Sequence, residues 1–343
     1  MKNYYTDCYK KFRCIASACP DSCCKDWDVV VDDKSFELYS KANGTFGEKL
    51  RSLMTIDDDG DRIFIKQGDR CPFWNSDMLC DIYINLGESC LCHTCKEFPR
   101  ITQDYTLFCE HTLSFACPEA ARLMLESDFE RNFAVCVTDD LQTDYSIYEM
   151  NFLLSARKRT LELLSDRTAP LSKRLCSLLA FNERVQNMLD DEIFDLSLMP
   201  SDKYKKQNGG DVSFIFELHG ALDIMSKEWL CELKKTADFS KTHKISSRFD
   251  KQLTAYLDYY VRRYYLSAID SMNVISTVKR MVCAYIVTGF ELERLENPYS
   301  AEIVKILQRY SKEVEHSYEN SELLEDEFIF NPLFSSQNLI DII

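Results

Sequence analysis

Cysteine is spread unevenly along this chain of 343 residues, and that distribution constrains the fold more than any other feature of the sequence. Twelve of the 16 cysteines lie within the first 117 residues, where an even spread would place about a third of them. The N-terminus, MKNYYTDCYKKFRC, is not followed by an apolar run of signal-peptide length. We therefore expect a cytoplasmic protein with reduced thiols that serve metal binding or catalysis, and disulfides are the alternative if the chain is exported.

Composition argues against several classes of protein. The net charge is −15, from 41 basic and 56 acidic residues, whereas nucleic-acid binding needs a basic surface. Only 9 glycines are present, which disfavours a doubly wound nucleotide-binding domain with its Gly-rich turns. No stretch approaches the roughly 18 apolar residues of a membrane span. We expect neither a nucleic-acid partner nor a membrane association.

The apolar pattern predicts a mainly α fold in which a small Cys-rich metal-binding domain with short strands, residues 1–125, precedes an all-helical domain, residues 126–343. In the first domain, residues 27–31 (WDVVV) favour a short strand, and residues 32–54 show helical spacing interrupted by glycine. The acidic run 57–61 is typical of a hairpin turn. An EF-hand loop would need glycine at its sixth position, where Arg62 stands.

Long helical patterns dominate the second domain. They cover residues 118–135, 145–165, 170–190, 211–235, 247–288 and 298–318. Residues 201–210 are polar and end in two glycines, which favours a loop or linker. The apolar tail after residue 320 is expected to dock on the helices.

The N-terminal cysteines form clusters with short spacings. These clusters are Cys14-x4-Cys19-x3-Cys23-Cys24, Cys71-x8-Cys80, Cys90-x-Cys92-x2-Cys95 and the single Cys117. Metal sites are commonly built from such short-range pairs, and thiolates favour zinc or an iron–sulfur cluster. Adjacent Cys23 and Cys24 cannot easily bind one ion together, so they serve two centres or one of them only packs. His93 is a further candidate ligand, with a surface or hydrogen-bonded role as the alternative.

The remaining cysteines carry weaker signals. Ligand and packing roles are both open for Cys8, Cys90, Cys92 and Cys109. Each of the last four cysteines stands alone in a helical pattern, and we expect it to be a small buried hydrophobic residue. These four are Cys136, Cys176, Cys231 and Cys283.

Five ordered strings within residues 8–125 carry a family resemblance. They are Cys14-Ile-Ala-Ser-Ala-Cys19-Pro-Asp-Ser-Cys23-Cys24 with Trp27 following, Cys71-Pro-Phe, Leu79-Cys80-Asp-Ile-Tyr83, Thr94-Cys95-Lys-Glu-Phe-Pro99-Arg100 and Ser114-Phe-Ala-Cys117-Pro-Glu-Ala-Ala-Arg122. In these strings the chain resembles the flagellin lysine-N-methylases and the related zinc- or iron-chelating Cys-rich domains. The strings span about a third of the chain.

The resemblance implies a bacterial enzyme that transfers methyl groups from S-adenosylmethionine to lysines of flagellin. It also implies a metal site, a 4Fe-4S cluster with zinc as the alternative. The ligands implied are Cys14, Cys19, Cys23, Cys24, Cys71, Cys80, Cys95 and Cys117. A four-iron cluster takes four cysteines, so the subset stays open, and the strongest candidates are Cys19, Cys23 or Cys24, Cys71, Cys80 and Cys95.

The sequence names neither the catalytic base nor the cofactor-binding residues. The Cys-x3-Cys-x2-Cys spacing of radical enzymes is missing, because the third position after Cys19 and Cys23 is Asp26. Five tyrosines in residues 256–265 suggest either a cage for a methylated ammonium or, as we favour, a packed helix face. His219 and His243 are expected to be structural, and Glu110-His111 is weak support for acid–base work. The alternative function is a non-enzymatic metal-binding protein.

Overall fold

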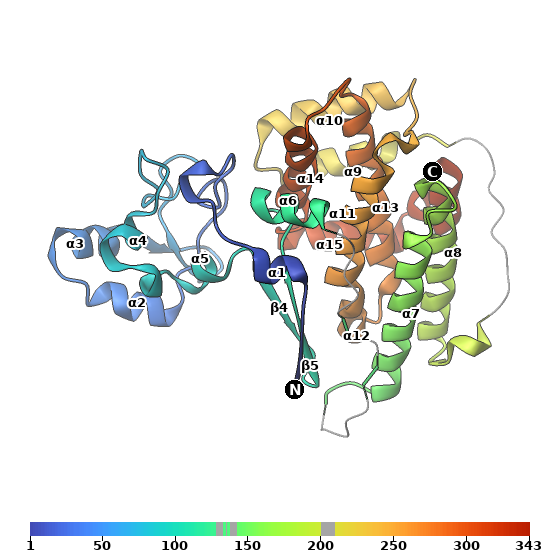
Figure 1. The fold of residues 1–343 in the computed structure, drawn as a ribbon, viewed down its shortest axis with the longest axis horizontal. Coiled ribbons are helices and arrows are strands. Elements are labelled where there is room, and N and C mark those ends of the chain that lie inside the picture. Colours follow the sequence, from blue (N-terminus) through green and yellow to red (C-terminus); the bar gives the residue numbers. More distant parts are fainter. Residues whose placement is uncertain (128–132, 135, 138–142, 200–209) are drawn as a thin grey trace.

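The computed structural model describes residues 1–127, 133–134, 136–137, 143–199 and 210–343. That part of the chain is mainly helical with a few short strands, which confirms the predicted fold class. The predicted loop 201–210 lies outside the described residues except for its last glycine, as do residues 128–132 and 135 of the predicted helix 118–135. A Cys-rich lobe lies at one end of the molecule and a helical body at the other (Figure 1).

Short elements build the Cys-rich lobe around a small apolar core. The elements are α2 (Asp33–Ser40), α3 (Gly44–Ser52), the hairpin β2 (Met54–Ile56) and β3 (Arg62–Phe64), α4 (Asp81–Leu86) and α5 (His93–Glu97). The acidic run forms the hairpin turn as predicted, with the Asp57 carboxylate accepting from the backbone of Asp59 and Asp61. The strand predicted at 27–31 is reduced to an isolated bridge between Val30 and Ile63.

A three-stranded sheet connects the lobe to the body (Figure 1). Its order is β1 (Lys2–Tyr5), β5 (Phe108–Leu113) and β4 (Arg100–Asp104), with β1 parallel and β4 antiparallel to β5. Helix α1 (Asp7–Lys11) follows β1 in the chain. Helix α6 (Pro118–Glu126) follows β5 and begins with Pro118 in its first turn, as expected. Glu110 of β5 forms a buried ion pair with Arg157, which fixes the sheet to the body.

Helices of the body pack around α13. The described elements are α7 (Ile147–Ser165), α8 (Leu171–Asp190), α9 (Ser213–Ala221), α10 (Lys227–Ser240), α11 (Asp250–Tyr264), α12 (Ala268–Ser271), α13 (Val274–Glu293), α14 (Ser300–Val314), α15 (Tyr318–Phe330) and α16 (Ser336–Ile342). Two predicted helices were wrong because each is divided. Ser226 caps α10 within 211–235, and left-handed Met272 with the cap Asn273 separates α12 from α13 within 247–288. The tail docks through buried Phe334, as predicted.

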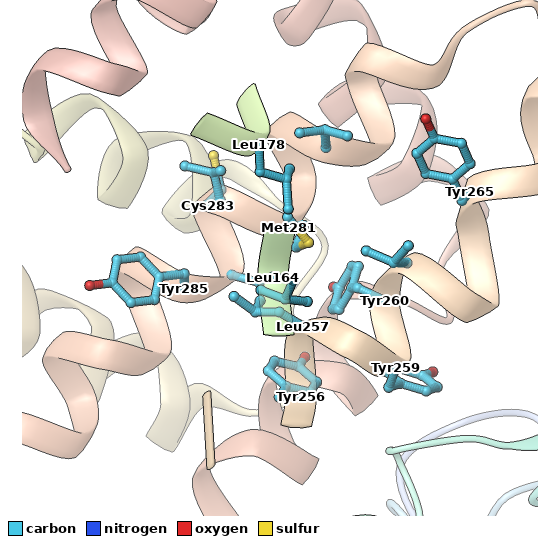
Figure 2. Close-up of a cluster of buried hydrophobic side chains, with 14 of the residues drawn as sticks. Leu164, Leu178, Tyr256, Leu257, Tyr259, Tyr260, Tyr265, Met281, Cys283 and Tyr285 are labelled. Carbon is cyan, nitrogen blue, oxygen red and sulfur yellow. The ribbon is translucent and has the colours of Figure 1, made fainter. Parts of the chain in front are cut away.

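Buried tyrosines of α11 and the segment after it form part of this core (Figure 2). The hydroxyls of Tyr256, Tyr259 and Tyr264 all donate to the carboxylate of Glu315. The Tyr265 hydroxyl donates to Asn182. The packed helix face is therefore confirmed, and these hydroxyls are satisfied by protein groups rather than by solvent.

Buried His219 has a defined neutral tautomer. Its Nδ1 lies 2.7 Å from the carbonyl oxygen of Ile215 and must donate, so Nε2 accepts from the Tyr310 hydroxyl at 2.8 Å. Burial lowers the pKa of His219 to about 4. The structural role predicted for His219 is confirmed, and His243 is exposed and stacks on Phe239 with ring centroids 3.8 Å apart.

We predict that His219 makes the protein less stable as the pH falls from about 6.5 to about 4. The unfolded chain binds a proton at His219 near pH 6.5 and the folded chain only near pH 4. The free energy of unfolding should therefore decrease by up to about 3 kcal/mol as the pH falls from 6.5 to 4. Urea titrations at pH 7, 5.5 and 4.5 on the parent and His219→Gln, which cannot titrate, should show a shallower pH slope in the variant. Parallel slopes would contradict the assignment.

Candidate metal centre

The loop between α1 and α2 carries four of the predicted ligands. A short 3-10 turn, Ala16–Ala18, follows Cys14, whose sulfur accepts from the Ala16 amide at 3.4 Å. The Cys19 thiol donates to the Asp21 carbonyl at 3.0 Å. Cys23 and Cys24 follow at the point where the loop enters the lobe, and the Cys24 carbonyl accepts from the backbone of Cys71 at 2.8 Å. These bonds hold the sulfurs of one short loop in a fixed local order.

One set of thiols gathers where this loop meets α6, and we call it the outer thiol group. It consists of Cys14, Cys19, Cys23 and Cys117. Burial raises the pKa of Cys117 to about 12, and the nearby thiols of Cys19 and Cys14 add to the rise. Hydrogen bonds from the α6 backbone lower the pKa but do not outweigh burial. Burial likewise raises the pKa of Cys19, with a contribution from Cys14. Cys14 and Cys23 are exposed, Cys19 is partly buried and Cys117 is buried.

A second set of thiols lines the small core of the lobe, and we call it the inner thiol group. It consists of Cys24, Cys71, Cys80, Cys92 and Cys95. Burial raises the pKa of Cys71 to about 12, and the thiols of Cys24, Cys80 and Cys92 contribute. Cys92 is buried in the apolar cluster that also contains Phe64 and Phe73. Distant segments therefore bring their sulfurs to one place.

In each of two hydrogen-bonded thiol pairs, the pKa of one thiol is lowered and that of the other is raised. A hydrogen bond from the Cys23 thiol lowers the pKa of Cys24 to about 7, whereas the same bond and burial raise the pKa of Cys23. The thiol of Cys95 donates to Cys92 in the same way, which lowers the pKa of Cys92 and raises that of Cys95. One sulfur of each pair is therefore biased toward the thiolate, the form that binds metals.

The thiols are the ligand type that zinc and iron–sulfur clusters take. All 16 cysteines lie in the described part of the chain, and each is a free thiol. No three His, Cys, Asp or Glu side chains among the described residues are arranged to hold an ion. The sulfurs thus lie near one another as pairs and neighbours, without the geometry of a finished coordination shell.

The structure differs from the sequence predictions at several cysteines. The eight predicted ligands all fall in the two thiol groups. Cys92 also lies in the inner thiol group beside Cys95. The sequence left the role of Cys92 open, although its Cys-x2-Cys spacing to Cys95 could have indicated a ligand pair. His93 is exposed, and its amide rather than its ring contacts Asp32. The packing predicted for Cys136 and Cys231 is wrong because both are exposed.

The remaining cysteines and His111 have local structural contacts. Cys283 is buried as predicted, and Cys176 is partly buried. Cys8 is buried with its thiol 3.3 Å from the Ser127 hydroxyl, and Cys109 lies 3.7 Å from the sulfur of Met1. His111 bridges Thr102 and Asn3 across the sheet, so the Glu110-His111 pair is structural.

Lys312 of α14 holds the thiol-bearing loop against the body. Its ammonium lies 3.0 Å from Asp21 and 2.9 Å from Asp26, with only 5% of the side chain exposed. Burial works against the charge, but the two carboxylates outweigh it and raise the pKa of Lys312. The chain is therefore fixed on both sides of Cys23 and Cys24.

Gln308, one turn before Lys312, connects two segments. Its amide nitrogen donates to the Asp21 carboxylate and to the Ala116 carbonyl, each at 2.9 Å. Asp21 lies in the thiol-bearing loop, and Ala116 directly precedes Cys117. A single buried side chain thus brings together the segments that contain the outer thiol group.

A cavity of about 50 Å³ lies between the sheet and α11. Thr6, Cys8, Thr112, Asp258 and Arg262 are among its lining residues. This volume holds a few water molecules at about 10–15 Å³ each, and it is far smaller than a nucleoside cofactor.

Comparison with known proteins identifies three relatives from Salmonella. The chain is 31% identical over 126 residues to the flagellar biosynthetic protein FliU of Salmonella muenchen, a match that covers 33% of this chain and 71% of FliU. It is 31% identical over 127 residues to a lysine-N-methylase of Salmonella typhimurium (strain LT2) and over 126 residues to one of Salmonella choleraesuis (strain SC-B67). No family model and no solved structure matches.

The match to FliU, at 31% identity over 71% of its length, shows the family of this chain. The chain belongs to the family of FliU and the lysine-N-methylases. The match covers only 30% of the length of each lysine-N-methylase and about a third of this chain. None of the helices among the described residues has the length and apolar character required to cross a bilayer.

We predict that Lys312→Met opens the thiol-bearing loop. The change leaves two carboxylates without their ammonium, at a cost of about 2 kcal/mol because they can regain some water. Tryptic cleavage after Lys25 in the native protein, followed by mass spectrometry, should then be about 30-fold faster. Lys305→Met, at an exposed position of the same helix, is the matched control and should leave the rate unchanged. Equal rates in both variants would show that Lys312 does not hold the loop.

Proposed function

We propose that this protein is an S-adenosylmethionine-dependent protein-lysine N-methyltransferase that acts on flagellin and contains a metal centre in its Cys-rich lobe. Membership of the family that includes proteins named lysine-N-methylase is the observation that carries this proposal. The name of FliU, flagellar biosynthetic protein, supports a flagellar substrate. The net charge of −15 is favourable for attracting a lysine-bearing partner.

The metal part of the proposal assigns an iron–sulfur cluster, with zinc as the alternative, to the clustered thiols. The candidate ligands are Cys14, Cys19, Cys23, Cys24, Cys71, Cys80, Cys92, Cys95 and Cys117. Support comes from the convergence of these sulfurs from segments far apart in the sequence, and from the two pairs biased toward thiolate. When bound, such a centre would cross-link these segments and stabilise the lobe.

Methyl transfer places two demands on the protein. The lysine nitrogen must be neutral and must lie in line with the methyl group of the sulfonium. An acidic surface concentrates the protonated lysine, which must then lose its proton near the donor. The cavity of about 50 Å³ beside α11 does not meet the size requirement of S-adenosylmethionine.

We predict lysine methylation in a direct assay. The protein, purified without oxygen, is incubated with flagellin and S-adenosylmethionine carrying a labelled methyl group. Mass spectrometry should find the label on flagellin lysines, and S-adenosylhomocysteine should suppress it as a product inhibitor. A flagellin preparation with acetylated lysines is the control substrate and should take up no label.

Two negative outcomes have different meanings. If S-adenosylmethionine binds but no lysine is labelled, the substrate assignment is wrong. If S-adenosylmethionine does not bind and metal is nevertheless present in stoichiometric amount, the methyltransferase proposal fails. The protein is then the alternative, a metal-binding member of the family without this activity.

A further inference from the structure

Helix α15 of the body presents one face to solvent. Its opposite side is buried through Asn320, Leu324 and Phe328, at intervals of four residues, and packs against α13. Exposed residues recur along the helix at positions i, i+3, i+4, i+7, i+10 and i+11, so they share one face. They are Glu319, Glu322, Leu323, Asp326, Ile329 and Phe330. We call this set the exposed face of α15.

Large apolar side chains make up half of this face. Phe330 is 77% exposed, whereas every other phenylalanine that the structure describes is buried or half-buried. Leu323 and Ile329 are exposed as well, and Leu333 continues the apolar surface beyond the end of the helix. Single exposed apolar side chains are normal on a protein surface, but four on one side of a helix form a patch typical of a protein contact.

Carboxylates lie among these apolar side chains, in a part of the chain without basic residues. Residues 313–343 contain eight acidic residues and no lysine or arginine. These 31 residues therefore carry −8 of the net charge of −15. Glu319, Glu322 and Asp326 bring part of this charge onto the exposed face of α15. The face is thus both apolar and strongly negative.

Two basic side chains of α13 lie beside α15 and are engaged with its backbone. The Lys279 ammonium donates to the Phe328 carbonyl at 2.7 Å, and Arg280 donates to the Ser321 carbonyl at 3.1 Å. They hold the helix from its buried side. The three carboxylates of the exposed face form no ion pair with any described residue. Their charge is therefore available to a cationic partner.

We propose that the exposed face of α15 is a docking site for the lysine-bearing protein substrate, which binds through a segment that combines lysine or arginine with large apolar side chains. This inference rests on the proposed function, because methylation of lysines requires a partner that presents ammonium groups. The ammonium groups pair with the carboxylates of the face, and the apolar side chains cover Phe330 and its neighbours. A second copy of this chain is disfavoured, since two such faces would bring six carboxylates together.

Binding of monomeric flagellin to the full chain, measured without S-adenosylmethionine, tests docking separately from methyl transfer. Phe330→Ala should weaken binding about tenfold, mainly through faster dissociation. The triple variant E319K/E322K/D326K should also weaken binding about tenfold and remove most of its dependence on salt. All these positions are exposed, so the circular dichroism and the melting temperature should stay those of the parent.

The matched control is E37K/E48K/D58K, which changes the net charge equally at exposed carboxylates of the lobe. This variant should bind flagellin as the parent does. In the methylation assay, Phe330→Ala should raise KM and leave kcat unchanged, because the face binds substrate but takes no part in the reaction.

Several results would overturn the docking site. They are no binding of flagellin to the parent, unchanged binding in both α15 variants, an equal loss in the lobe control, or self-association of the parent that the α15 variants abolish. Failure of docking and failure of the reaction remain distinguishable. Flagellin that binds through α15 without being methylated refutes the reaction alone, and methylation with the same KM in every variant refutes docking alone.

Discussion

The buried ammonium of Lys312 between Asp21 and Asp26 is the contact on which the placement of the thiols depends. A lysine that is 5% exposed needs close counter-charges to stay ionised, and the two aspartates provide them from one loop. Asp26 adopts a left-handed backbone with φ of 81°, a conformation that a residue other than glycine keeps only when its surroundings hold it. Its amide donates to the Asp69 carbonyl at 2.7 Å, and its carboxylate meets Lys312. These contacts fix the backbone two residues after Cys24.

The two parts of the molecule are stabilised by different means. The helical body buries a large and continuous set of apolar side chains around α13, as in the cluster of Figure 2, and needs no further cross-link. The lobe has short helices and a small core with few large residues. Cys92 is buried in this core, and Cys71, Cys80 and Cys95 pack against it. Metal–sulfur bonds would supply the stabilisation that this small core lacks.

The sequence predicts those features that depend on local pattern. Regular apolar spacing gave α7 and α8 nearly to the residue, and the eight ligand candidates that the family resemblance implied all fall in the two thiol groups. Features set by tertiary contacts could not be predicted. The break at Met272 depends on a left-handed residue followed by the Asn273 cap, and neither alters the apolar period. Nothing in the spacing indicated that Lys312 and Gln308, almost 300 residues away, fix the loop that carries Cys19 to Cys24. Cys231 was misjudged because its helix was recognised while the face that it occupies was not.

The position of the outer thiol group links metal binding to the helical body. Cys117 is the residue directly before α6, and α6 packs against α14, the helix of Lys312 and Gln308. Gln308 contacts both the thiol-bearing loop and the segment of Cys117, so any shift of one of these segments relative to the other must strain its two hydrogen bonds. A metal bound by Cys14, Cys19, Cys23 and Cys117 would restrain the same two segments. Because both restraints act on one geometry, metal binding by thiols of these two segments and docking of the loop on α14 should stabilise each other.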